Sequence, residues 1–501
     1  MADTKREIER KYESLGGGLP DLTGVTGVAG VVHRGVAHLD ATYHDTADER
    51  LTASKVTLRR RTGGSDAGWH LKFPVAPGVR DEIHAPLSDT LPDVLASLVR
   101  SRVRDAALLP VVRLRSDRDV THLVDAEGRL LAEVSVDAVH AERLTGGGGE
   151  ARWTEIEVEL ADGGDPAFLD KVEKKLRKAG VRPSASASKL ARALEETAPR
   201  RERPSAPAGD PVTAGDHVLA YVRAQRDVIV ELDPAVRRDT EDAVHRMRVA
   251  TRRLRSTFKS FGEILAPAVT GPIADELKWL AGELGLERDR EVLAARLTAS
   301  LAEVPADLVR GPVGERLGSW ARAEHSGAHG RILGILDSRR HLALLDTLDA
   351  LIASPPLTKA AAKKPRKILA KAVKKDFRKV AALVEEAVEL EPGTDRDVAL
   401  HNARKKTKRT RYAAEAAEPA LGKPAKTMIR SMKSLQSLLG EHQDSVMARQ
   451  TLRELSAVAH AAGESAFTYG LLHEREAQRA RRVEDELPAV WKKVKGAAAD
   501  L

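Results

Sequence analysis

Two patterns of apolar and polar positions divide the chain. Up to about residue 199, apolar and polar residues alternate with a period of two, which is typical of β-strands. From residue 214 onward the chain is rich in Ala, Leu and Arg, and its apolar residues recur with the helical period. Residues 200–213, RRERPSAPAGDPVT, show neither pattern and indicate a linker. We therefore predict an α+β protein with a strand-rich domain over 1–199 and a helical domain over 214–501.

The alternation in the N-terminal domain is inverted, because charged residues recur where a core would need apolar ones. Glu7, Glu9 and Lys11 share one strand face in EIERK, and Arg59 and Arg61 share one in TLRRRT. The segment EIEVEL carries three carboxylates on one face: Glu155, Glu157 and Glu159. Like charges repel on a shared face unless metal ions or facing cations neutralise them. A closed barrel with a polar interior would let both signs converge.

Converging carboxylates and cations predict a particular chemistry. Mg²⁺ and Mn²⁺ take oxygen ligands, usually a few carboxylates with waters and substrate phosphates. Arg and Lys bind phosphate oxygens, and Arg often does so with two parallel hydrogen bonds. Phosphoryl transfer needs mainly positioning and charge neutralisation, so no Ser, Cys or His nucleophile is required. The pattern therefore predicts a site for a metal-bound oligophosphate.

Composition narrows the class of protein. The chain has 501 residues, enough for two or three domains with their own cores, and it has no cysteine, which excludes disulfides and Cys-ligated zinc. No signal-peptide pattern and no apolar run of about 18 residues is present, so we expect a cytoplasmic protein without a membrane segment. The net charge of +8 is uneven, since 50 Lys and Arg face 40 Asp and Glu from residue 214 onward.

A basic helix occurs twice in the helical domain, and its two copies lie 156 residues apart. They read VHRMRVATRRLRSTF from Val244 and LHNARKKTKRTRYAA from Leu400. In each copy, cations follow a His by three, seven and ten residues, which places four residues on one helix face: His245, Arg248, Arg252 and Arg255, and His401, Arg404, Lys408 and Arg411. Cations on one face repel one another, so we expect an anion to offset the repulsion.

The duplication extends to a second pair of segments. LKWLAGELGLERD and MKSLQSLLGEHQD align at an offset of 155, with Gly285 over Gly440 and Asp289 over Asp444. A helical unit of roughly 150 residues is therefore duplicated, with copies at about 214–353 and 368–501. For the two aspartates we favour pairing with arginines or helix capping over metal binding.

The N-terminal domain resembles the CYTH superfamily, also called the triphosphate tunnel metalloenzymes, whose signature is an ExExK strand, here Glu7-Ile8-Glu9-Arg10-Lys11. Further segments match in family order: TYHDTADERL (42–51), LRRRTGG (58–64), GWHLKFP (68–74), RDEI (80–83), AEVSVD (132–137), EIEVEL (155–160) and SKL (188–190). The resemblance spans nearly all of residues 1–195. It implies an eight-stranded antiparallel β tunnel that binds triphosphate.

The matching motifs imply two sets of site residues. The first set would hold Mg²⁺ or Mn²⁺: Glu7, Glu9, Asp137, Glu155 and Glu157. The second would hold phosphate oxygens: Lys11, Arg59, Arg61, Lys72 and Lys189. Glu7, Glu9, Lys11 and Asp137 are expected to carry catalysis, in which Glu9, Asp137 or a second metal would orient water. Glu82 is implied as a further tunnel carboxylate.

One family arginine has two possible positions in this chain. The spacing to the following His122 favours Arg118, whereas alternation favours Arg113 and Arg115. Only a bulge would place all three in the tunnel. His44 stands where many family members carry an aromatic residue, and we interpret it as a surface or packing change.

The C-terminal repeats resemble the CHAD domain, a helical module often fused to CYTH domains. The resemblance covers about residues 214–501 and implies duplicated four-helix bundles related by a pseudo-twofold axis, a basic central pore and inorganic polyphosphate as ligand. Besides the eight residues of the two basic faces, we expect polyphosphate to contact their helix neighbours: Arg253, Lys405 and Arg409. Polyphosphate granules are a candidate location. The lysine cluster over 363–379 is expected to be a solvated face or an extension of the anion path.

Three functions compete at this point. The first is metal-dependent hydrolysis of inorganic triphosphate, with polyphosphate bound by the helical domain. The second is the same fold acting on a nucleoside or thiamine triphosphate, cyclase chemistry included. The third is a polyphosphate-binding scaffold without enzymatic activity. The chain has six Phe, five Tyr and five Trp, few for a base-stacking platform, so the first is favoured. Nucleic acid is expected to bind nonspecifically at most, and the oligomeric state stays open.

Overall fold

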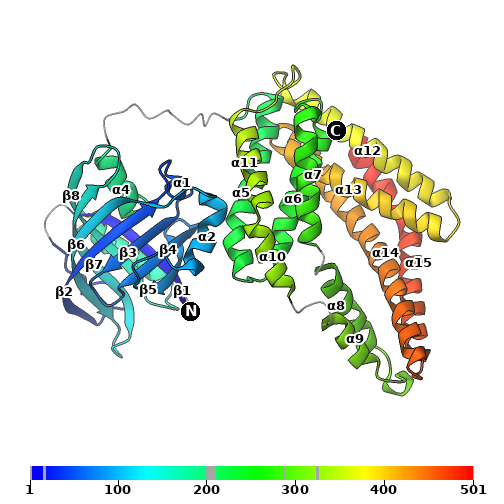
Figure 1. Ribbon diagram of the computed structural model, residues 1–501, viewed down its shortest axis with the longest axis horizontal. Coiled ribbons are helices and arrows are strands. Elements are labelled where there is room, and N and C mark those ends of the chain that lie inside the picture. Colours follow the sequence, from blue (N-terminus) through cyan, green and yellow to red (C-terminus); the bar gives the residue numbers. More distant parts are fainter. Residues whose placement is uncertain (1–2, 15–17, 199–209, 286–287, 323–326, 500) are drawn as a thin grey trace. The chain divides into compact units, whose positions relative to one another are not determined.

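The alternating segments of the chain form β-strands, and the Ala/Leu/Arg-rich segments form helices (Figure 1). This computed structural model describes all residues except 1–2, 15–17, 199–209, 286–287, 323–326 and 500. The chain divides into two compact units, Met1–Ala206 and Pro207–Leu501. Most of the predicted linker over 200–213 lies outside the described residues. The predicted α+β class, with a strand-rich part followed by a helical part, is confirmed.

Eight antiparallel strands close into a ring in the first unit. They are β1 (Asp3–Glu13), β2 (Gly30–Asp45), β3 (Thr57–Thr62), β4 (Gly68–Ala76), β5 (Val79–Pro86), β6 (Leu109–Val124), β7 (Leu130–Arg143) and β8 (Glu150–Leu160). The order is β5-β4-β3-β2-β6-β7-β8-β1, and the pairing of β1 with β5 closes the ring. A two-residue strand, β9 (Arg182–Pro183), adds to β1. The predicted eight-stranded tunnel is therefore confirmed.

Helices cover the apolar outer face of the ring. On β8, Ile156 and Val158 alternate with the carboxylates and pack outside the ring with Val172 of α3 (Ala167–Lys178). On the opposite wall, α1 (Arg50–Ala53) and α2 (Asp93–Val103) cover the outward apolar residues of β3, β4 and β5. Because these apolar side chains are buried outside the ring, the inward positions of the same strands are free to carry charged residues.

A further helix, α4 (Lys189–Glu196), packs against the tunnel-facing side of the sheet. Its Leu190 and Leu194 are buried with Trp153 of β8, which shares a strand face with Glu155. The Ser188 hydroxyl accepts a hydrogen bond from the Ala191 amide at 3.1 Å and caps the helix. This start places Lys189 in the first turn, beside the charged interior.

The second unit is helical throughout its described length. Its helices are α5 (Ala214–Arg237), α6 (Ala243–Ser260), α7 (Pro267–Glu283), α8 (Arg288–Ala302), α9 (Val313–Arg322), α10 (Ala328–Asp337), α11 (Arg339–Ala353), α12 (Pro365–Glu389), α13 (Thr394–Leu421), α14 (Lys423–Ala461) and α15 (Phe467–Ala499). None of the described helices is both long and apolar enough to span a bilayer.

The order of helices repeats, but the hydrophobic cores do not separate at the repeat boundary. The duplicated segments fall on α6 and α13 and on α7 and α14. One core joins both repeats, since it contains Met247 of α6 and Leu400 of α13. A second core contains Leu297 of α8, Leu317 of α9 and Leu452 of α14, together with residues of α15. Since α6 and α13 pack against each other, the two basic helices become neighbours.

Candidate functional site

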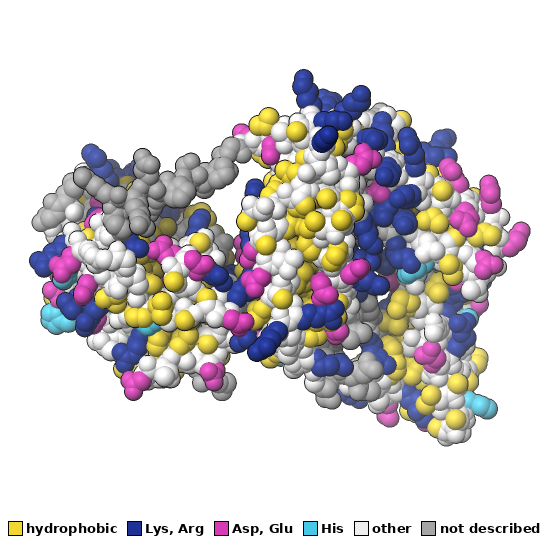
Figure 2. Space-filling model, turned by 45° about the horizontal axis from the view of Figure 1, so that its top comes forward, with side chains coloured by type: hydrophobic (Ala, Val, Ile, Leu, Met, Phe, Trp, Pro, Cys, Tyr) yellow, Lys and Arg dark blue, Asp and Glu magenta, His cyan; other side chains and the backbone are white. Residues whose placement is uncertain are grey.

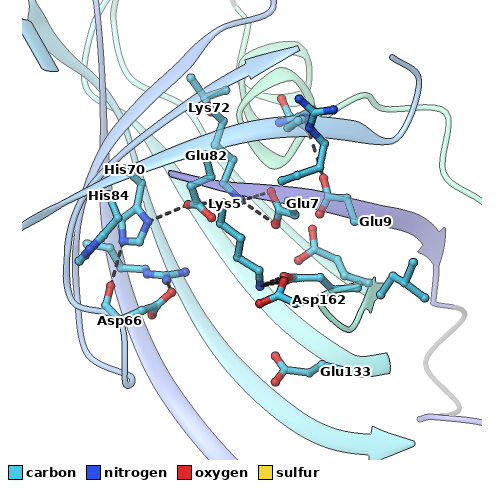
Figure 3. A pocket seen from close by; sticks show the side chains of 18 of the residues that line it. Lys5, Glu7, Glu9, Asp66, His70, Lys72, Glu82, His84, Glu133 and Asp162 are labelled. Carbon is cyan, nitrogen blue, oxygen red and sulfur yellow. Dashed lines mark hydrogen bonds and ion pairs between the residues drawn. The ribbon is translucent and has the colours of Figure 1, made fainter. Parts of the chain in front are cut away.

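The interior of the ring holds a cavity of about 860 Å³ lined by charged side chains of both signs. Among the described residues, nine Lys and Arg and eight Asp and Glu side chains line it, so their charges nearly balance. Figure 3 shows part of this lining, including Glu7, Glu9, Lys72 and Glu82. Buried charges are stable only with partners, and here the partners are one another.

The ExExK strand supplies three residues to this network. The Lys72 ammonium donates to both carboxylate oxygens of Glu7, at 2.8 and 2.6 Å, and lies 3.5 Å from Glu82 (Figure 3). Lys11 contacts Glu157 and lies 3.1 Å from Glu9. Burial alone would lower the pKa of Lys11, but Glu157 and Glu9 outweigh it and raise this pKa above its usual value. Lys11 is therefore a permanent cation in the tunnel.

A deeper cluster combines three buried carboxylates with Lys189. Oxygens of Asp137, Glu155 and Glu157 all lie within 4.8 Å of one another. The Lys189 ammonium contacts all three, at 2.9, 2.8 and 2.6 Å respectively. Arg118 donates two parallel hydrogen bonds to Asp137, both of 2.8 Å, and a third of 2.8 Å to Glu157. Three β-strands and the start of α4 meet at this point.

The cations keep this cluster ionised. Burial alone would raise the pKa of Asp137, but Lys189 and Arg118 outweigh it and lower that pKa. For Glu157 the effect of burial is overcome by Lys11, Lys189 and Arg118, so its pKa lies well below the usual value. An oxygen-only donor set suits a hard divalent cation, and the position of the Lys189 ammonium shows that one cationic group can contact all three carboxylates. The cluster therefore fits Mg²⁺ or Mn²⁺.

Arg59 and Arg61 on β3 also line the cavity. Arg59 donates to the Tyr43 hydroxyl at 3.2 Å and lies 4.0 Å from Glu82. Arg61 pairs with Asp66, and burial, with Arg59 and Arg118 nearby, lowers its pKa to about 9. These two arginines add positive charge at a point where the tunnel already holds other cations.

The position of the family arginine is decided by strand register. Arg118 pairs in register with Asp137 and lines the cavity. Arg113 instead pairs with Asp40 at 2.5 Å, and Arg115 lies 3.8 Å from Glu142 and is half-exposed. No register shift separates Arg113 from Arg118 along β7, so residues of opposite parity face opposite sides of β6. Arg113 and Arg115 therefore lie outside the tunnel, and the expectation that they bind substrate is corrected.

Several residues of the cavity were absent from the predicted site, His70 and Arg80 among them. His70 Nδ1 lies 2.8 Å from Glu82 (Figure 3), and Arg80 Nε lies 3.9 Å from Glu9. Alternation could have found both, because His70 precedes Lys72 by two residues and Arg80 precedes Glu82 by two. Arg80 adds a cation from β5, whereas burial lowers the pKa of His70 to about 4, so its ring contributes a neutral hydrogen-bonding group.

In the helical unit, four of the predicted basic residues gather where α6 packs on α13. They are Arg248, Arg252, Arg404 and Lys408, called here the cation cluster. Burial, followed by the nearby Arg252, Arg404 and Arg248, lowers the pKa of Lys408 to about 7. Figure 2 shows Lys and Arg side chains in a band on this unit. Like charges from two helices are thus brought together, as an anion site requires.

Three other predicted arginines are engaged with carboxylates. Arg253 lies 3.1 Å and Arg411 2.7 Å from Glu415. Arg409 lies 2.6 Å from Asp376. The Arg253 and Arg409 pairs connect α13 to α6 and α12 and so contribute to helix packing, while contact of the three arginines with polyphosphate stays a prediction.

The remaining predicted residues lie around the cation cluster. His245 and Lys405 are exposed, and Arg255 is half-buried. His401 lies against Gln443, and burial, with Lys405 beside it, lowers its pKa. Asp444 lies near Arg404, although burial raises its pKa, while the side chain of Asp289 lies outside the described residues. Among these residues, Asp444 partly offsets the effect of the arginines on the pKa of Lys408.

Comparisons with known proteins agree with the geometry. The CYTH domain model matches residues 5–194, and the CHAD domain model matches residues 220–453. Two Mycobacterium tuberculosis proteins, "Uncharacterized protein MT2285" (strain CDC 1551 / Oshkosh) and "Uncharacterized protein Rv2226" (strain ATCC 25618 / H37Rv), are each 38% identical over 504 residues, covering 97% of this chain and 96% of theirs. The chain belongs to the family in which a CYTH domain, the triphosphate tunnel metalloenzyme fold, is followed by a CHAD domain.

Solved structures resemble parts of the chain. "PptA from Streptomyces chartreusis" is 22% identical, with 56% of this chain and 99% of that chain covered and a TM-score of 0.47. The CHAD domain from the plant Ricinus communis is 24% identical, with 60% of this chain and 96% of that chain covered and a TM-score of 0.45.

Proposed function

We propose that the CYTH domain hydrolyses inorganic triphosphate to phosphate and diphosphate with Mg²⁺ or Mn²⁺, and that the CHAD domain binds inorganic polyphosphate. The observation that carries the catalytic part is the nearly balanced set of cations and carboxylates inside a closed ring. A metal-bound oligophosphate needs both signs, the carboxylates for the metal and the cations for its phosphates.

The lining supports an inorganic substrate over a nucleotide. Among the described lining residues, Tyr43 is the one Phe, Tyr or Trp, and its hydroxyl already receives a hydrogen bond from Arg59. Base recognition usually uses an aromatic face for stacking. The cavity instead offers charges, which suit a chain of phosphates.

The residues divide between metal and substrate. We assign Glu7, Glu9, Asp137, Glu155 and Glu157 to the metal, which when bound would stabilise negative charge on the phosphate oxygens. We assign the phosphates to the cations that line the cavity: Lys11, Arg59, Arg61, Lys72, Arg118 and Lys189. Glu9 is the favoured carboxylate to orient water. Lys11 and then Lys72 and Arg80 help keep the pKa of Glu9 low despite its burial. Glu9 is held less closely, by Lys11 at 3.1 Å, than Asp137, which has Arg118 at 2.8 Å and Lys189 at 2.9 Å.

The cation cluster supports polyphosphate binding by the CHAD domain. Four cations from two helices lie close enough to depress the pKa of one of them, and a polyanion would relieve this repulsion. Polyphosphate offers a regular series of charges that could contact the cations of both α6 and α13.

A metal-by-substrate panel on the full chain tests the proposal. Triphosphate, ATP, thiamine triphosphate and long polyphosphate would each be incubated with Mg²⁺, Mn²⁺ or EDTA, with phosphate release and cyclic nucleotide measured. We expect triphosphate to be turned over fastest and only with metal. Preferred turnover of ATP or thiamine triphosphate would replace the substrate assignment, and polyphosphate binding without any turnover would favour the scaffold alternative.

A further inference from the structure

Two glycines recur at equivalent positions of the CHAD repeats without a conformational need for glycine. Gly285 follows the end of α7, and Gly440 lies inside α14, 155 residues later. Neither is among the glycines with positive φ. Glycine costs about 0.5–1 kcal/mol relative to alanine within a helix, so a glycine such as Gly440 points to a packing reason.

Each glycine lies under the guanidinium of an arginine. A Cβ at Gly285 would come within 2.7 Å of Cζ and Nη2 of Arg248 and 2.8 Å of its Nε. A Cβ at Gly440 would come within 3.3 Å of Nη2 and 3.5 Å of Nε of Arg404. The two arginines are themselves repeat equivalents, 156 residues apart. A glycine–arginine contact therefore occurs in both repeats, and both the glycines and the arginines are repeat equivalents.

Both arginines belong to the cation cluster. Arg248 on α6 and Arg404 on α13 lie near Lys408, which is half-buried and also has Arg252 nearby. On the α14 side, Arg404 also lies close to Asp444, one turn beyond Gly440. The guanidinium of Arg248 turns its face toward Gly285, since its Cζ, Nη2 and Nε are almost equally near, whereas Arg404 turns its Nη2 and Nε edge toward Gly440. A Cβ at either position would crowd the arginine, so the glycine allows its charge to be presented there.

We propose that Gly285 and Gly440 are positioning residues, which seat the guanidinium groups of Arg248 and Arg404 in the anion-binding cation cluster. The proposal rests on the polyphosphate binding proposed above. The glycine does not touch the anion; it leaves room for the arginine that does.

The test compares two alanine substitutions around the end of α7. Gly285→Ala would displace the end of the flexible Arg248 side chain, whereas Gly282→Ala adds a Cβ with nothing within 4 Å. We expect both variants to melt at or above the wild-type temperature. Gly285→Ala should weaken binding of long polyphosphate to the full chain by about tenfold, close to the effect of Arg248→Ala, as for loss of a charged hydrogen bond. Gly282→Ala should bind like the wild type.

Two further readouts separate positioning from a general structural role. In Gly285→Ala, the slope of log affinity against log salt concentration should become shallower by about the amount expected for the loss of one phosphate contact. In an Arg248→Ala background, Gly285→Ala should weaken polyphosphate binding no further. Gly440→Ala, in the middle of α14, repeats the test where the fold is least at risk, with a smaller loss because its clearance is 3.3 Å.

The outcomes distinguish the two proposals. If the wild type fails to bind polyphosphate, the proposed CHAD function is wrong and the positioning role is lost with it. If the wild type binds, Arg248→Ala weakens binding and Gly285→Ala equals Gly282→Ala, only the positioning role is overturned.

Discussion

The tunnel and the cation cluster both gather Lys and Arg, but they treat these charges in opposite ways. In the tunnel, Lys189 contacts three carboxylates and its pKa is raised far above the usual value, because Asp137, Glu157 and Glu155 outweigh its burial. In the helical unit, Lys408 is half-buried beside arginines, and its partial burial and these arginines lower its pKa to about 7. The protonated form of a lysine is therefore stabilised in the tunnel, at Lys189, and destabilised in the cation cluster, at Lys408.

This difference teaches how each site would meet an anion. In the tunnel, each cation already has carboxylate partners. A metal would therefore have to displace cations from the carboxylates, and a triphosphate would have to displace carboxylates from the cations, which suits precise positioning for chemistry. In the cation cluster, Arg252, Arg404 and Arg248 add to the effect of burial and lower the pKa of Lys408, so a polyanion would gain by contacting it, which suits binding along a chain of repeated charges. Variants that break one site should leave the other intact.

The largest effect is expected from a tunnel carboxylate. Glu9→Gln removes one charge from the proposed metal set without changing the side-chain volume, and should slow metal-dependent triphosphate hydrolysis by at least about a hundredfold. Glu173→Gln is the matched control, since Glu173 pairs with Arg10 at 2.7 Å on α3 outside the ring. Phosphate release at saturating metal, with melting curves for both variants, makes the comparison. Equal rates in the two variants would remove Glu9 from the site.

The next effect concerns polyphosphate. Reversing two charges of the cation cluster, with Arg252→Glu and Lys408→Glu together, should weaken polyphosphate binding by about a hundredfold or more. The control reverses Lys371 and Lys375, which are exposed and lie 3.0 and 3.9 Å from Glu263, and should cost less than about threefold at physiological salt. Binding titrations of the full chain would measure both. Similar losses in the two variants would mean diffuse surface electrostatics, while triphosphatase activity should stay unchanged in both.

The sequence predicted some tunnel residues correctly and left the position of one arginine open. Alternation in EIERK predicted that Glu7, Glu9 and Lys11 share a face, and all three line the cavity, because strand parity is a local property. The choice between Arg118 and Arg113 depended on the register of β6 against β7, which a single strand does not reveal. The pairing of β6 with β7, and not the local pattern of β6, therefore determines which arginine faces the tunnel.

The basic helices show a similar limit. Helical periodicity placed four residues of each copy on one face, but it did not show the ion pairs of their neighbours, Arg409 with Asp376 from α12 and Arg253 with Glu415 from α13. Such partners come from other helices and cannot be read from spacing alone. The pairing of Arg411 with Glu415 is different, since four residues separate them on one helix and the sequence contained the signal.

A smaller effect should appear as a pH dependence of polyphosphate binding. Lys408 has a pKa of about 7 in the free protein, and a bound polyanion favours its charged form, so affinity should fall as pH rises through 7, by up to about tenfold per pH unit. Burial lowers the pKa of His401, so that residue would act only at lower pH. Lys408→Arg should keep the affinity and lose the dependence near pH 7. Persistence of the full dependence in that variant would assign it to another group.

The smallest effect is expected from separating the domains. The cores of the first unit are built from residues between Tyr12 and Leu194, and those of the second from residues between Ala214 and Val494, so no described core needs both. All residues proposed for catalysis precede residue 199. A fragment of residues 1–199 should therefore hydrolyse triphosphate within about twofold of the full chain, while residues 214–501 fold and bind polyphosphate without hydrolysing triphosphate. Steady-state rates with Mg²⁺ or Mn²⁺, alongside circular dichroism of each fragment, provide the measurement. A soluble, folded N-terminal fragment without activity would show that the catalytic site needs the CHAD domain, and the contrast between two independent sites would have to be abandoned.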